Sequence, residues 1–69
     1  MHPKVAEMRR RLEPVLRLAL ELYERGDRET RDRVATILGK YLNCEMSTRE
    51  ALRRLRRLAE EMAKERSNE

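Results

Sequence analysis

Residues 22–38, LYERGDRETRDRVATIL, join the end of one amphipathic helix to the start of another. We expect Gly26 to take the left-handed conformation that closes a helix, and Asp27 is a typical N-cap for the helix that follows it. A connection this short places consecutive helices side by side and antiparallel. The stretch therefore predicts a tight helical hairpin.

Upstream of this turn, apolar residues recur at steps of three and four residues, which is the period of one helical face. They are Val5, Met8, Leu12, Val15, Leu16, Ala19, Leu22 and Tyr23. We expect a helix over residues 3–25, with Pro3 in the first turn, where its missing N–H is harmless. Pro14 removes a backbone hydrogen bond inside this helix, so it predicts either a kink near residues 10–12 or a new helix that starts there.

Downstream, the same apolar spacing predicts a second helix over residues 28–44, with Asn43 as its C-cap. Residues 47–50, STRE, match a capping box, in which the Ser47 hydroxyl accepts from the N–H of Glu50 and the Glu50 carboxylate reaches back to Ser47. A third helix is expected over residues 48–66, followed by a frayed tail at 67–69. The sequence thus predicts one domain over residues 1–69, an all-α antiparallel three-helix bundle in which the first and third helices run parallel.

Composition limits what this bundle can do. The 69 residues are 43% charged, carry a net charge of +4 and include no Phe and no Trp. A chain this short encloses no deep cleft, so we expect no enzyme activity and no cofactor. Cys44 has no second cysteine to pair with, and together with His2 it is too little for a zinc site, so no metal is expected. We expect His2 to be incidental at a mobile terminus, and Cys44 to be a small apolar filler beside a loop.

The charges are unevenly placed along the chain. With the first and third helices parallel, arginines of both should gather at one end of the bundle as a basic patch of Arg9, Arg10, Arg53, Arg54 and Arg57. The third helix has its arginines in the first half and its glutamates in the second, which opposes the helix macrodipole. The pattern suits either a partner-binding patch or a solvated face with i,i+4 pairs such as Arg56–Glu60 and Arg57–Glu61.

Apolar residues on the first two helices exceed what one small core needs, since the first helix is apolar over roughly 200° of its circumference. Surplus apolar area normally marks an interface. The predicted protein interface is Leu18, Leu20, Ile37, Tyr41 and Cys44, with Tyr41 as the main anchor. Ala35 and Gly39 form a small-residue flank that predicts close packing, either by another helix of the bundle or by a partner helix.

Residues 47–55, STREALRRL, together with the i,i+4 pairs Glu7–Arg11, Glu13–Arg17 and Glu21–Arg25, resemble de novo designed helical mini-proteins of the binder type. That resemblance implies an engineered protein binder. Residues 35–56 also resemble part of the ANTAR-type RNA-binding domain, on Gly39, Leu42, Ser47, Glu50-Ala51-Leu52 and Leu55-Arg56. This second resemblance implies RNA binding, although the chain lacks that family's third helix after this unit.

Our leading hypothesis is a protein-binding module with apolar anchors on the first two helices and flanking arginines, which suits an acidic protein target. Nucleic-acid (RNA) binding through the basic end and homodimerisation as a structural bundle are the alternatives. The sequence offers no membrane-spanning run and no apolar signal region, so we expect no membrane partner. A cytoplasmic setting follows, or no native compartment at all for a designed protein.

Overall fold

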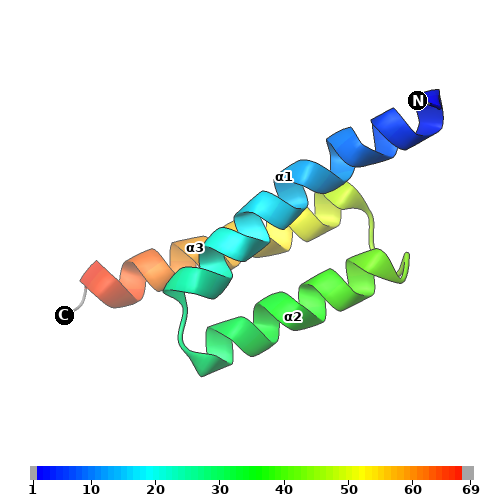
Figure 1. Ribbon diagram of the computed structural model, residues 1–69. Coiled ribbons are helices and arrows are strands. Elements are labelled where there is room, and N and C mark those ends of the chain that lie inside the picture. The colour runs from blue at the N-terminus through cyan, green and yellow to red at the C-terminus, as the bar shows by residue number, and fades with distance from the viewer. Residues whose placement is uncertain (1, 68–69) are drawn as a thin grey trace.

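A computed structural model describes residues 2–67 and contains three helices, α1 (Pro3–Arg25), α2 (Arg28–Leu42) and α3 (Thr48–Ser67). Each helix contacts the other two. α1 and α3 run in the same direction and α2 runs against them, in a molecule of 49 × 18 × 18 Å (Figure 1). The predicted all-α three-helix bundle is confirmed.

α1 begins with a cap that the sequence interpretation missed. The Nδ1 atom of His2 accepts a hydrogen bond from the Lys4 N–H at 3.2 Å, so His2 acts as the N-cap. The helix then continues without a break through Pro14, whose ring is exposed on its outer side. The alternative of a new helix starting near Pro14 is therefore wrong.

The turn between α1 and α2 requires a residue without a side chain at position 26. Gly26 is extended, with φ −83° and ψ 161°, so the prediction of a left-handed Gly26 is wrong. A Cβ atom at this position would lie 2.5 Å from Cγ2 of Thr30, closer than atoms can approach, which explains why glycine stands there. The Asp27 carboxylate accepts from the Thr30 N–H at 2.9 Å, which confirms the predicted N-cap of α2.

The left-handed residue lies at the other turn, after α2. Cys44 has a φ of 61°; its N–H donates to the Tyr41 carbonyl at 3.1 Å, and the Glu45 N–H donates to the Lys40 carbonyl at 2.8 Å. This pair of bonds is a Schellman motif, in which the left-handed position is usually glycine. Asn43 is the C-cap as predicted, but α2 ends at Leu42, two residues earlier than expected.

α3 begins with half of the predicted capping box. The Ser47 hydroxyl accepts from the Glu50 N–H at 3.1 Å, as predicted. The Glu50 carboxylate does not serve as the second half of the box and instead accepts from Arg53 at 2.7 Å and Arg54 at 3.0 Å. α3 extends to Ser67, so the prediction of fraying is wrong at residue 67, and the rest of the predicted tail, residues 68–69, lies outside the described part.

The core is small and receives residues from every helix. Its buried members are Val15, Ala19, Leu22, Val34, Ala51, Leu55 and Leu58. Partly buried side chains surround it, among them Leu18, Ile37 and Tyr41. The Tyr41 hydroxyl lies 2.9 Å from the Thr48 hydroxyl and so ties the end of α2 to the start of α3. The expectation that Leu18, Ile37 and Tyr41 exceed the needs of the core is wrong, because all three pack against it.

Candidate interaction surfaces

The exposed large hydrophobic side chains of the described residues all lie on α1 and α2. They are Val5, Met8, Leu16, Leu20, Tyr23 and Leu42, and we call this surface the α1–α2 face. At about 100° per residue, the members on α1 fall within about 120° of arc, which overlaps at Met8 the arc that buries Val15, Ala19 and Leu22. The wide apolar arc of α1 is therefore half core and half open surface.

Contacts at both ends show that α2 flanks this arc of α1. At one end, the guanidinium carbon of Arg31 lies 5.4 Å from the centroid of the Tyr23 ring, and the Arg31 Nε donates to the Tyr23 carbonyl at 3.1 Å. At the other end, Met8 of α1 and Leu42 of α2 line one hollow. The apolar surface of α1 thus continues onto α2.

The residues predicted as the protein interface lie in different parts of the structure. Leu20 is 59% exposed and belongs to the α1–α2 face. Leu18 lines the groove between α1 and α3, whereas Ile37 lines the groove between α2 and α3. Tyr41 is partly buried, and Cys44 is exposed, so the prediction that Cys44 is a small apolar filler beside the loop is wrong. Tyr41 and Cys44 line the same hollow as Met8 and Leu42, but the five predicted residues do not form one surface.

Several members of the α1–α2 face were missed by sequence reasoning, which gave Leu16 and Tyr23 to the core. Leu16, Leu20 and Tyr23 stand at steps of four and three residues, so their common side of the helix is readable from the sequence. The sequence signal for these exposed residues is that the helix carries two parallel apolar rows, whereas a core of this size can bury only one.

Gly39 lies on an open flank of α2. A Cβ atom built there would meet nothing within 4 Å, and Ala35 one turn earlier is also exposed. The expectation that another helix of the bundle packs closely on this flank is therefore wrong. A glycine inside a helix costs about 0.5–1 kcal/mol relative to alanine, and within residues 2–67 no close neighbour excludes a side chain at Gly39.

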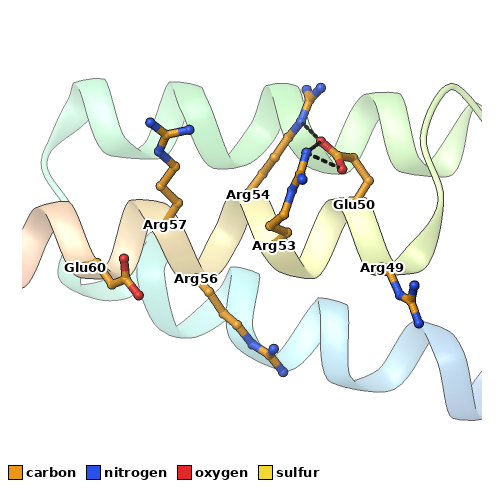
Figure 2. Close-up of a pocket in the computed structure, with 7 residues that line it drawn as sticks. All are labelled: Arg49, Glu50, Arg53, Arg54, Arg56, Arg57 and Glu60. Carbon is orange, nitrogen blue, oxygen red and sulfur yellow. Dashed lines mark hydrogen bonds and ion pairs between the residues drawn. The ribbon is translucent and has the colours of Figure 1, made fainter.

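A second surface lies on α3 and is built from arginines. We call Arg49, Arg53, Arg54, Arg56 and Arg57 the arginine surface; they line a shallow hollow together with Glu50 and Glu60 (Figure 2). The carboxylate of Glu50 holds Arg53 and Arg54, and these hydrogen bonds, the one from Arg53 first, lower the pKa of Glu50 below its usual value. Figure 2 shows Arg49, Arg56 and Arg57 reaching away from that carboxylate.

The predicted basic patch is divided by the structure. Arg53, Arg54 and Arg57 lie together on the arginine surface, whereas Arg9 and Arg10 are exposed on α1, outside the group around this hollow. Glu61, the expected partner of Arg57, instead accepts from Arg33 at 3.1 Å and links α3 to α2. No ion pair joins Arg56 to Glu60 within residues 2–67, so the two predicted i,i+4 pairs of this region are wrong.

Within residues 2–67, no helix is both long and apolar enough to cross a bilayer. The same residues contain no cluster of His, Cys, Asp and Glu side chains able to hold a metal ion. In comparisons with protein-family models, curated proteins and solved structures, the chain matched none of them.

Proposed function

We propose that this chain is a protein-binding module whose contact surface is the α1–α2 face. One observation carries the proposal: the exposed large hydrophobic side chains of the described residues all gather on two helices that lie side by side. Apolar side chains scattered singly on a surface are ordinary, but a contiguous apolar patch usually marks an interaction site. Met8, Leu42 and Leu20, at 69%, 60% and 59% exposure, would gain most from being covered.

The shape of this face suits a helix of the partner. Leu16, Leu20 and Tyr23 form a row along the axis of α1, which is the arrangement that receives an amphipathic helix. The open flank at Ala35 and Gly39 would let the backbone of such a helix approach α2 closely. A standard interface takes about 800 Å² from each partner, and one long side of a molecule of 49 × 18 × 18 Å is of this order.

Arginines beside the apolar row favour a partner with an acidic rim. Arg31 is held over the Tyr23 ring at the margin of the face, and Arg9 lies on the same side of α1 by helical period. Charges at a rim contribute mainly to steering and orientation, while the buried apolar anchors supply most of the affinity. The proposed partner is therefore a protein with an apolar helix bordered by carboxylates.

The regularity of the chain supports the further proposal that this module is an engineered binder. Helix caps at Asp27 and Ser47 agree with the fold, as do the i,i+4 pairs Glu7–Arg11, Glu13–Arg17 and Glu21–Arg25 at 2.7, 3.2 and 3.4 Å. Such agreement of local and global preferences is the aim of design. Cys44 and Gly39 break the pattern, and both lie at or beside the exposed part of α2.

The proposal can be tested with a matched pair of substitutions on α1. Leu20→Glu and Arg17→Gln change the net charge equally, but only Leu20 belongs to the α1–α2 face. Each variant and the parent chain would be used to select binders from a displayed library of protein fragments. We expect fragments with apolar helices to be enriched on the parent and on Arg17→Gln, and their affinity for Leu20→Glu to be at least tenfold weaker.

Sedimentation of the same samples separates this function from the structural alternative. If the parent chain sediments as a dimer, Leu20→Glu sediments as a monomer and no fragment of the library is enriched, the result would favour homodimerisation. Equal enrichment on the parent chain and on Leu20→Glu would contradict the proposed contact surface. Circular dichroism of both variants controls for folding, which Leu20→Glu should not disturb because the side chain is already exposed.

A further inference from the structure

The arginine surface of α3 is separate from the α1–α2 face and needs its own explanation. We propose that it binds the phosphate backbones on either side of the major groove of a B-form DNA duplex, without reading the base sequence. The inference is independent of the proposed protein-binding function, because the exposed apolar side chains belong to α1 and α2 and the arginine surface belongs to α3.

The charge of this surface is only partly neutralised within the chain. Glu50 is the carboxylate that holds Arg53 and Arg54, at 2.7 and 3.0 Å. Within residues 2–67, the ion pairs of the structure include none that engages Arg49, Arg56 or Arg57. The hollow that the five arginines line contains two carboxylates, Glu50 and Glu60, and further carboxylates lie beside Arg54 and Arg57 in the groove between α2 and α3. A positive field therefore extends from this side of α3 into solvent.

The position of the arginines along α3 works against helix stability. They occupy the first half of the helix, where the macrodipole is positive and cations are unfavourable. The glutamates that would suit this end stand mostly in the second half, at Glu60, Glu61 and Glu65. Folding of the bundle gives no reason for this order, whereas binding of an anion does.

Their arrangement around the helix fits a duplex groove. Arg49, Arg53 and Arg57 follow one another at i,i+4, a rise of about 6 Å per step, on the side of α3 opposite the buried Leu55. Figure 2 shows Arg49 and Arg56 reaching to one side of the helix, and Arg53, Arg54 and Arg57 reaching to the other. A helix about 10–12 Å across fits a major groove about 12 Å wide, so that Arg49 and Arg56 would face one strand and the other three arginines the opposite strand.

The side chains present also argue against other anionic partners. Both tyrosines of the chain lie on α1 and α2, so α3 offers no aromatic ring on which single-stranded bases could stack. α3 also carries none of the exposed large hydrophobic side chains of the described residues, which leaves no anchor for an acidic protein. The major groove of A-form RNA is too narrow to admit a helix. Double-stranded DNA is the partner that charge and shape alone can hold.

The test measures how the affinity for a short DNA duplex of mixed sequence depends on salt, by fluorescence anisotropy. The triple variant Arg49→Gln, Arg56→Gln, Arg57→Gln spares the Glu50 pairs, and its matched control is Arg17→Gln, Arg25→Gln, Arg28→Gln on α1 and α2. Both triple variants lose the same charge. We expect log K to fall linearly with log salt, and the slope to lessen by about 0.9 for each lost phosphate contact in the α3 variant only.

Companion ligands and a folding control complete the design. We expect an RNA duplex and a single DNA strand of equal length to bind at least tenfold more weakly than the DNA duplex, and polyglutamate to bind more weakly still. Equal loss of affinity in the two triple variants would show that net charge alone acts and would overturn the site. Polyglutamate binding as tight as the duplex would overturn the choice of DNA. Circular dichroism must show that both triple variants remain helical.

Discussion

At the scale of single residues, the left-handed backbone of Cys44, with a φ of 61°, carries a cost that glycine would not. The Cβ atom of an L-residue crowds the following carbonyl in this conformation, whereas glycine has no Cβ. We therefore expect Cys44→Gly to raise the free energy of unfolding by about 1 kcal/mol, measured by chemical denaturation. Cys44→Ala is the matched control, because it removes the same exposed thiol but keeps the Cβ. An equal gain from Cys44→Ala would refute the backbone explanation.

Single-residue features were predictable where the cause is local. Asp27 and Ser47 each accept from an N–H three residues ahead, so a few consecutive residues contain the whole interaction. The left-handed residue was not predictable in this way. Its position depends on where α2 ends, and the hydrogen bonds that end α2 are donated by the N–H groups of Cys44 and Glu45. Gly26 stands in its turn for another reason, because a side chain there would clash with Thr30.

At the scale of a helix, the start of α3 depends on the Ser47 hydroxyl, which satisfies the Glu50 N–H at 3.1 Å. This N–H has no acceptor inside the helix, so Ser47→Ala should lower the free energy of unfolding by about 0.5–2 kcal/mol. Ser47→Asp keeps an acceptor at the same place and should retain most of the stability. The denaturation midpoints of the two variants provide the comparison, and a midpoint of Ser47→Ala equal to that of the parent would contradict the cap.

The bounds of the helices, to within two residues, and the width of their apolar arcs were readable from the sequence, but the rotation of each helix about its axis was not. α1 is apolar over roughly 200°, and periodicity gives no reason why Val15 and Leu22 should be buried while Leu16 and Leu20 are exposed. That choice is made by the neighbours, since α2 and α3 both pack on the side of Val15. For the same reason the interface residues predicted from arc width included Leu18 and Ile37, which the bundle uses itself.

At the scale of the whole molecule, acid should unfold the bundle partly by protonating two carboxylates, those of Asp27 and Glu50. The Thr30 N–H lowers the pKa of Asp27 below its ordinary 3.8, and the Arg53 and Arg54 hydrogen bonds lower the pKa of Glu50 below 4.5. Carboxylates whose pKa is lower in the folded state stabilise it above the unfolded pKa, and this stability is lost as pH falls through the folded pKa. We expect the Tm to be flat above pH 4.5 and to fall below it.

Asp27→Asn isolates one part of this acid response, because asparagine also caps a helix but does not titrate. Its Tm near neutral pH should stay close to that of the parent, while its decline below pH 3.8 should be shallower. Superimposable acid profiles of the parent and of Asp27→Asn would show that this cap does not contribute to the pH dependence.

The parallel course of α1 and α3 has a mechanical consequence. The start of α1 and the end of α3 lie at opposite ends of the long axis (Figure 1), so a force applied between Pro3 and Ser67 pulls the two helices in opposite directions along their shared side. In this shear geometry, the packing of Val15 and Leu22 against α3 resists all at once, whereas a force that pulled the helices apart from one end would break the contacts one after another. The arrangement of the helices therefore lets the bundle resist a pulling force along its 49 Å axis.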